Sequence, residues 1–375
     1  MPPQRRSVRP ALPVVACVGE TMAVLAPNPA GPLDSADVLA LNIGGAESNV
    51  ALYLAAHGVP TRWISRVGDD PFGRLVLERV ADGGVDVLGV QIDPDRPTGV
   101  YFKHRGPNGN QVHYYRYGSA ASAMTAAVLD TPPVSSADAL HLSGITPALS
   151  DSCRELMSVA LGRGAGAAGL GGAVAGRGGP LISFDVNWRP ALWRDVADPG
   201  ALLRDLANRA DIVFVGLDEA NAVWGCASPA AVRALLPDPA VLVVKESDRG
   251  ATAFRDHEVV AVPALTVEVV DVVGAGDAFA AGFLAGRFTG LDLTGQLRLG
   301  HLTAAAALRV SSDHGPLLDR ATTARLLAAD AESWATAKIT GDAENGAGTA
   351  DACRCAAAGP AADAGSVAGA AGDQG

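Results

Sequence analysis

The glycine-rich segment around Asp277 combines residue types that can bind an anion and accept a proton. It reads Gly274-Ala275-Gly276-Asp277 and opens an apolar stretch with helical spacing. Glycines let the backbone approach a ligand closely, and the first N–H groups of a helix have no acceptor within the helix. The segment therefore predicts a hole for an anionic group, with the Asp277 carboxylate kept ionised by the helix dipole and able to take a proton from an attacking hydroxyl. The alternative is that Asp277 only caps the helix.

A second glycine-rich segment, residues 44–49, also leads into a helical pattern. Asn49 offers both a donor and an acceptor, so it suits a hydroxyl-rich ligand such as a polyol. The alternative is that Gly44 and Gly45 only form a turn and that Ser48 or Asn49 caps the helix. Together, the two segments favour transfer of a phosphoryl group to a sugar hydroxyl.

Alternating strand and helix patterns are expected to position these two segments. Apolar runs of strand length lie at 14–18, 62–67, 139–142, 181–186, 212–215 and 241–245. Helical patterns lie at 48–57, 72–82, 150–161, 199–209, 229–235, 276–285 and 293–310. This alternation is typical of an α/β fold with a doubly wound, mostly parallel sheet covered by helices on both faces. We expect one such domain over residues 12–335.

Four stretches depart from that rhythm. Residues 98–117 read as a hairpin around the turn residues 106–110, and we expect this hairpin to stand outside the main sheet. Residues 162–179 are rich in glycine and alanine, which predicts a mobile surface loop. Residues 1–11 are expected to be a flexible N-terminus, and the low-complexity segment 336–375 a disordered tail.

Composition narrows the class of partners. The net charge of -11 argues against nucleic acid as a partner, because a protein that binds a phosphate backbone would show clustered Lys and Arg. No apolar run approaches the roughly 20 residues that cross a bilayer, so we expect no membrane partner. The short apolar run 11–18 contains Pro13 and reads better as a buried strand than as a secretion signal. Five scattered cysteines without metal or disulfide spacing fit a reducing cytoplasm.

The two glycine segments together resemble the signatures of the ribokinase/PfkB family of carbohydrate kinases. The N-terminal match covers residues 44–51 and continues in the segment that begins at Gly68, and the C-terminal match covers residues 271–279. Two signatures in the right order are far more specific than either alone. The resemblance extends from residue 14 to about residue 310.

The resemblance implies a ribokinase-like sheet with a small β lid from about 21–43 and 97–118, and it implies ATP and Mg²⁺ as cofactors. It makes Asp277 the catalytic base beside an anion hole. The residues that would form this hole are Gly274, Ala275 and Gly276. The residues that would contact the sugar beside Asp277 are Gly44, Gly45 and Asn49.

Two further segments narrow the resemblance to the subgroup that phosphorylates 2-keto-3-deoxygluconate, an acidic keto sugar. These segments are Tyr114-Tyr115-Arg116 and Asp185-x-Asn187-x-Arg189. A carboxylate favours an arginine fork and phenolic donors, which a neutral sugar does not require. The resemblance therefore assigns the sugar acid to Tyr101, Tyr114, Arg116 and Arg189.

Alternatives stay open for these side chains. A four-residue hairpin loop would place Tyr101 opposite Arg116, whereas a five-residue loop would place it beside Tyr115. The hairpin is alternatively an ordinary solvated ribbon with surface Arg and Tyr. Arg189 alternatively contacts ATP or bridges both ligands, since fructokinase-like relatives carry the same motif.

The nucleotide side departs from the family pattern. Val272 and Val273 replace hydroxyl residues near the triphosphate, so the site would rely more on backbone donors. Ser247 stands where the family has a glycine, between the expected ATP contacts Lys245 and Gly250. The full set of expected ATP contacts is Asn187, Arg189, Lys245, Ser247, Gly250, Gly274 and Gly276.

The metal motif is only partly present. Gly216 replaces the family's asparagine, whereas Glu219 is retained and could organise Mg²⁺ through water. Glu219 is therefore the candidate metal residue.

Three functions compete. The first is an ATP-dependent kinase that converts 2-keto-3-deoxygluconate to its 6-phosphate, and the second is a fructokinase- or ribokinase-like kinase of a neutral sugar. The third is a non-catalytic sugar- or nucleotide-binding relative in which the replacements have eroded activity. A Rossmann dehydrogenase is disfavoured because no GxGxxG follows the first strand. Exposed edges of the lid could pair between subunits, which would give a homo-oligomer.

Overall fold

The central sheet has eight strands in the order β14-β13-β12-β11-β10-β9-β1-β4. The computed structural model describes residues 11–106, 109–162 and 179–340. The sheet is parallel from β4 to β12, and β13 and β14 extend it as an antiparallel edge. The strands are β1 (Val15–Val18), β4 (Thr61–Ile64), β9 (Ala139–Ser143), β10 (Leu181–Asp185), β11 (Ile212–Gly216), β12 (Val241–Lys245), β13 (Gly250–Arg255) and β14 (Glu258–Pro263). The doubly wound sheet expected from the sequence is confirmed.

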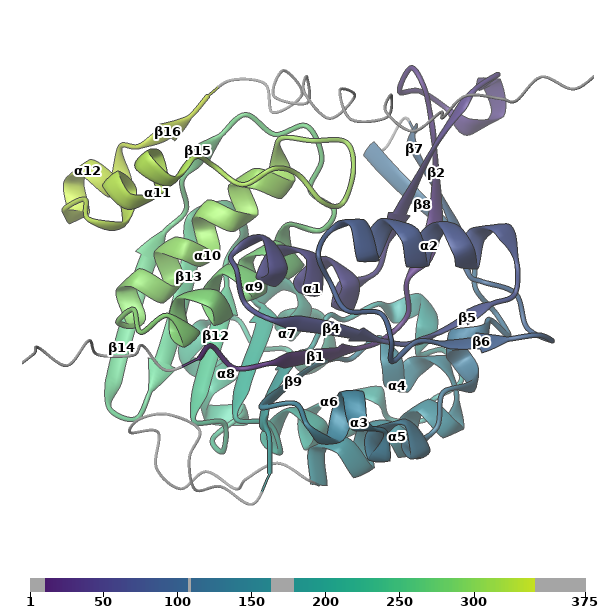
Figure 1. Ribbon diagram of the computed structural model, residues 1–375. Coiled ribbons are helices and arrows are strands. Elements are labelled where there is room, and N and C mark those ends of the chain that lie inside the picture. Colours follow the sequence, from purple (N-terminus) through teal and green to yellow (C-terminus); the bar gives the residue numbers. More distant parts are fainter. Residues whose placement is uncertain (1–10, 107–108, 163–178, 341–375) are drawn as a thin grey trace, which may run out of the picture.

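Helices cover both faces of this sheet (Figure 1). Alternate residues of β1 face opposite sides, so Val15 and Cys17 join one hydrophobic core while Ala16 and Val18 join the other. The longer helices are α1 (Ala46–Ala56), α2 (Pro71–Asp82), α5 (Asp151–Gly162), α6 (Pro199–Asn208), α9 (Ala275–Phe288) and α10 (Leu293–Leu308). The shorter ones are α3 (Pro132–Ser135), α4 (Thr146–Leu149), α7 (Leu217–Trp224), α8 (Pro229–Leu235), α11 (Arg320–Leu327) and α12 (Ala331–Ala335). The core on the side of Val15 is packed by α1, α9 and α10.

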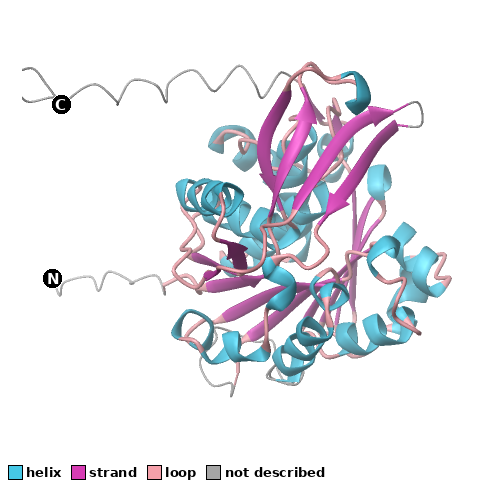
Figure 2. Cartoon of the chain, turned by 90° about the vertical axis from the view of Figure 1, so that its right-hand side faces the viewer, coloured by secondary structure: helices cyan, strands magenta, loops and turns pink. Residues whose placement is uncertain are grey.

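A separate four-stranded sheet, in the order β3-β2-β7-β8, stands outside the central sheet (Figure 2). Its strands are β2 (Met22–Pro27), β3 (Leu39–Gly44), β7 (Val100–Gly106) and β8 (Gly109–Tyr115). These strands fall in the two segments expected to form the lid. Two small pairs complete the fold, β5 (Arg66–Gly68) with β6 (Gln91–Asp93) and β15 (Thr266–Val267) with β16 (Lys338–Ile339).

The hairpin register differs from both registers considered from the sequence. Tyr101 of β7 lies opposite Tyr114 of β8, and the ladder continues until Gly106 faces Gly109. Two residues separate the paired strands, which is the commonest length for a hairpin loop and is shorter than the four- or five-residue loops expected from the sequence. Residues 107–108 themselves lie outside the described residues.

Two other boundaries differ from the sequence expectations. The strand expected at 62–67 ends at Ile64, because Arg66–Gly68 pairs with β6 instead of continuing in the central sheet. The first residues of the tail expected from residue 336 belong to the fold, since Lys338–Ile339 pairs with β15 and Ile339 is buried in the core. The N-terminal segment up to residue 10, the glycine- and alanine-rich residues 163–178 and the chain from residue 341 lie outside the described residues. Within the described ranges, no helix combines the length and apolar character needed to cross a membrane.

Candidate active site

Asp277 lies in the first turn of α9, where two asparagine side chains reach it from other parts of the fold. The Asn49 side-chain amide, on α1, donates to Asp277 Oδ2 over 2.9 Å. The Asn187 side-chain amide, just after β10, donates to Asp277 Oδ1 over 3.3 Å. The N-cap of α9 is Gly274, and no side chain caps that helix end. The reading of Asp277 as a mere helix cap is therefore wrong.

The protonation of Asp277 is set by burial. Loss of solvent raises the pKa of this carboxyl to about 7, the hydrogen bond from Asn49 lowers it, and the nearby Asp185 raises it again. Desolvation outweighs the favourable interactions, so the carboxyl is less strongly ionised than the helix dipole alone would make it. A carboxyl whose pKa lies near neutrality can both accept and release a proton, as a general base must.

An ion pair lies near Asp277 at the carboxyl ends of the parallel strands. Lys245, at the end of β12, donates to Asp185 at the end of β10 over 2.7 Å. Burial lowers the pKa of Lys245, but Asp185 and Glu219 outweigh burial, so the pKa is raised and the amine is charged. Asp185 was not among the expected site residues. Its position after a buried strand, at the edge where α/β sheets bind ligands, was the signal that could have identified it.

Three residues around the site adopt left-handed backbone conformations. Gly274 has φ 82°, Asn187 has φ 42° and Ser247 has φ 56°. Glycine takes this conformation without strain and asparagine tolerates it, whereas serine pays a steric cost. The cost at Ser247 explains in physical terms why a glycine suits this position.

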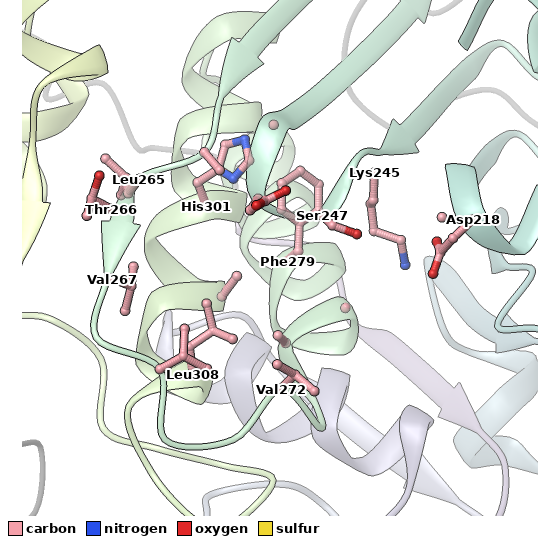
Figure 3. A pocket seen from close by; sticks show the side chains of 18 of the residues that line it. Asp218, Lys245, Ser247, Leu265, Thr266, Val267, Val272, Phe279, His301 and Leu308 are labelled. Atoms are coloured by element: carbon pink, nitrogen blue, oxygen red, sulfur yellow. The ribbon is translucent and has the colours of Figure 1, made fainter. Parts of the chain in front are cut away.

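A cavity of about 910 Å³ opens beside the start of α9 (Figure 3). Its volume is within the range of small-molecule sites. The polar wall includes Asp218, Glu219, Lys245, Ser247, Gly250 and Gly276, and the apolar wall includes Leu265, Val267, Val272, Phe279 and Leu308. Such a cavity suits a nucleotide, with phosphates toward the charged end and a base toward the apolar end. Of the expected ATP contacts, Asn187, Arg189 and Gly274 do not line it.

Glu219 makes contacts that bear on the expected metal site. Its Oε2 accepts the N–H of Gly216 over 2.8 Å, and its Oε1 lies 3.4 Å from Arg189 Nη1. Among the described residues, no cluster of three His, Cys, Asp or Glu side chains could hold a metal ion. Mg²⁺ in kinases is carried largely by phosphates and water, with one or two carboxylates nearby. The donor set therefore fits Mg²⁺ that arrives with the nucleotide, with Glu219 and Asp218 on the cavity wall.

The glycines of the second segment permit close packing. A side chain at Gly44 would collide with the Tyr101 hydroxyl and with Asp313, and one at Gly45 would collide with Thr21. Gly45 has φ -176°, which is extended backbone and not a left-handed turn. The helix-cap reading is wrong as well, because the Asn49 side chain reaches Asp277 instead.

Tyr101, Tyr114 and Arg116 lie together, but two of them already have partners in the protein. The Tyr101 hydroxyl donates to Asp313 Oδ2 over 2.8 Å. Arg116 is 9% exposed and forms an ion pair with Glu20, while its guanidinium lies 5.6 Å from the centre of the Tyr114 ring. The reading of Arg116 as a solvated surface residue is therefore wrong. Glu20 and Asp313 were not expected from the sequence.

Comparison with known proteins agrees with this geometry. Residues 13–320 match the pfkB family carbohydrate kinase domain. The chain belongs to the pfkB family of carbohydrate kinases. It is 33% identical over 306 residues to a 2-dehydro-3-deoxygluconokinase of Thermoproteus tenax. The aligned residues make up 80% of this chain and 90% of that protein. It is 33% identical over 316 residues to the Bacillus subtilis protein of the same name, with 83% and 94% covered.

One solved structure with a similar fold contains bound ATP. The fold matches a Pyrococcus horikoshii sugar kinase in complex with ATP, with a TM-score of 0.68, 26% identity, and 80% of this chain and 93% of that chain covered. As a pfkB family member, this chain is an ATP-dependent carbohydrate kinase. The individual roles of the site residues stay predictions.

Proposed function

We propose that this chain phosphorylates the 6-hydroxyl of 2-keto-3-deoxygluconate, with Asp277 as general base. Its carboxyl is partly buried at the start of α9, accepts hydrogen bonds from Asn49 and Asn187, and has a pKa raised to about 7 by desolvation. This single arrangement carries the proposal, because it sets a proton acceptor beside the helix amides that would face the phosphoryl group.

The chemistry requires alignment more than covalent participation. Phosphoryl transfer passes through a loose transition state, so the protein must hold the hydroxyl in line with the γ-phosphate and neutralise developing charge. Asp277 would take the hydroxyl proton as the oxygen attacks phosphorus. The amides of Gly274, Ala275 and Gly276 would stabilise the charge on the phosphoryl oxygens, and Lys245 would add a positive charge at the cavity's polar end.

Side chains on and next to the four-stranded sheet support an acidic substrate. Arg116 is buried beside Tyr101 and Tyr114, and its Nε has no hydrogen-bond partner among the described residues. A substrate carboxylate could use that donor together with the Tyr114 hydroxyl. The relatives from Thermoproteus tenax and Bacillus subtilis are named for this same sugar acid, 2-dehydro-3-deoxygluconate.

One observation favours a neutral sugar as the second candidate. Glu20 already neutralises Arg116 inside the protein. A neutral substrate such as fructose would leave that ion pair intact, whereas a sugar acid has to share the guanidinium with Glu20.

An ADP-release assay with a panel of sugars tests the proposal. The panel contains 2-keto-3-deoxygluconate, its galactose-derived epimer, fructose, ribose and adenosine. We expect the highest kcat/KM with one of the two keto sugar acids. Higher kcat/KM with fructose or ribose would support the neutral-sugar alternative, and nucleotide binding without ADP release for any sugar would support the non-catalytic one.

The four-stranded sheet, β3-β2-β7-β8, is proposed to act as a lid that excludes water during transfer, and we call it the lid sheet below. Its edge strand β8 carries the exposed aromatic residues Tyr114 and Tyr115. A homo-oligomer through this sheet remains a proposal, which light scattering on the purified protein would test. The cytoplasmic location also remains a proposal, supported by unpaired cysteines at Cys17, Cys153 and Cys226.

A further inference from the structure

A buried lysine connects the lid sheet to the turn that precedes α9. Lys103 lies on β7 and is 7% exposed. Its Nζ is 3.1 Å from Asp271 Oδ2, 2.6 Å from Asp313 Oδ1 and 3.5 Å from the Ser311 carbonyl oxygen. An ammonium group carries three N–H donors, and three acceptors lie around this one. All three acceptors belong to segments outside the lid sheet.

Asp271 and Asp313 each contact the turn that precedes α9. Asp271 Oδ1 accepts the N–H of Val273 over 3.2 Å. The main-chain oxygen of Asp313 packs so closely on Gly274 that a Cβ there would lie 2.6 Å from it. Asp313 Oδ2 also accepts the hydroxyl of Tyr101, which is on the same strand as Lys103. The lid strand and the turn are therefore joined through the Asp271 carboxylate and through Asp313, whose carboxylate contacts the lid strand and whose main chain packs on the turn.

The ammonium charge is needed for this arrangement. Asp271 is 8% exposed and Asp313 is 4% exposed, so two carboxylates would repel each other in a medium of low dielectric constant if Lys103 were absent. Burial lowers the pKa of Lys103, but Asp313 and Asp271 outweigh burial and raise it above its ordinary value. The lysine is therefore charged while the contact is closed.

We propose that Lys103 is a positioning residue that couples closure of the lid sheet to the shape of the anion-binding turn. It acts through Asp271 and Asp313 and does not touch either substrate. When the lid sheet is closed, the ammonium holds both carboxylates, and the amides at the start of α9 point toward the phosphoryl group. The proposal rests on the kinase function proposed above for its kinetic readout, but its structural readout is independent of that function.

Lys103→Ala tests the proposal because it removes the ammonium group from between two carboxylates and leaves a space that a small alkylammonium ion can enter. We expect kcat at saturating ATP and sugar to fall about 10²-fold, the scale of a misplaced catalytic array. Hydrogen exchange of the amides at 272–277 should become faster in the same variant. Added methylammonium should restore both kcat and amide protection, whereas tetramethylammonium, which is too large and has no N–H, should restore neither.

Arg298→Ala is the matched control. Arg298 is buried like Lys103, at 9% exposure, and it donates to the carbonyl oxygens of Leu327 and Ala329. This variant should keep wild-type kcat and wild-type exchange at 272–277, with no response to methylammonium. If Lys103→Ala does not fold, Lys103→Met combined with Asp271→Asn removes the like-charge repulsion and should show the same loss of kcat and amide protection.

The outcomes separate this inference from the proposed function. A wild-type protein that releases no ADP with any sugar refutes the proposed function, and the exchange experiment still decides the role of Lys103. The inference is overturned if the Lys103 variant keeps wild-type exchange at 272–277 or wild-type kcat. It is overturned as well if methylammonium restores neither property, because the ion pair would then be only a structural contact.

Discussion

The Asp277 carboxylate shows how single residues define this site. Each carboxylate oxygen can accept about two hydrogen bonds, and the Asn49 and Asn187 amides donate one to each. The carboxylate is thus oriented while it still has acceptor capacity for a substrate hydroxyl. Burial keeps its pKa near the pH at which the enzyme is expected to work.

The pH dependence of kcat/KM should report Asp277. Its pKa is raised to about 7, and the base must be ionised to accept a proton. Ionisation is complete above that pKa and is lost below it, so kcat/KM should fall about tenfold for each pH unit below 7. A steady-state profile from pH 5 to 9 measures this limb. The residual rate of Asp277→Asn should lack the limb, and a wild-type profile that is flat down to pH 5 would contradict the assignment.

Arg116→Ala tests the carboxylate contact. We expect KM for 2-keto-3-deoxygluconate to rise about tenfold to a hundredfold, which is the range for a hydrogen bond to a charged group. KM for a neutral sugar should change little. Because the change leaves Glu20 buried without its partner, the double variant with Glu20→Gln provides the folded control. An equal rise of KM for acidic and neutral sugars would remove the carboxylate assignment.

At the scale of elements, the loop after β12 carries strain that its sequence does not relieve. Ser247 has φ 56° and lies on the cavity wall between Lys245 and Gly250. Gly250 has φ 142°, a conformation that only glycine takes readily, and it packs against the backbone of Val262. The loop thus uses one glycine where the backbone conformation would favour two.

Ser247→Gly should stabilise the protein by about 1 kcal/mol, because glycine adopts the left-handed conformation without the steric cost paid by serine. Urea denaturation of both proteins measures the free energy of unfolding. Ser247→Ala keeps the strain and removes only the hydroxyl, so it should not gain stability. A glycine variant less stable than wild type would show that the serine hydroxyl contributes more than the strain costs.

The sequence predicts the central elements better than the lid sheet. Buried parallel strands read as continuous apolar runs, so β1, β9, β10, β11 and β12 are recognisable without tertiary information. The β7–β8 register was not predictable, because a shift by one residue is decided by the turn and by which side chains find partners. The edge strands β13 and β14 were also not expected from the sequence.

For the molecule as a whole, the site forms where α1, α9 and the carboxyl ends of the parallel strands meet beneath the lid sheet. Asn49 and Asp277 are 228 positions apart, and Tyr101 and Asp313 are 212 positions apart. The two glycine signatures made the first of these pairings predictable in outline. The partners Glu20 and Asp313 were not predictable, because contacts between residues so far apart in the sequence have no local pattern.

The measurement that tests this account most directly is the turnover of Asp277→Asn. Asn keeps the shape of the side chain and removes the proton acceptor, so kcat should fall about 10² to 10⁴-fold while ATP affinity by calorimetry changes little. Asp198→Asn is the control, because Asp198 caps α6, which packs on the other face of the central sheet from α9, and Asn also caps well. It should keep wild-type turnover. Near-normal turnover of the Asp277 variant would contradict the account.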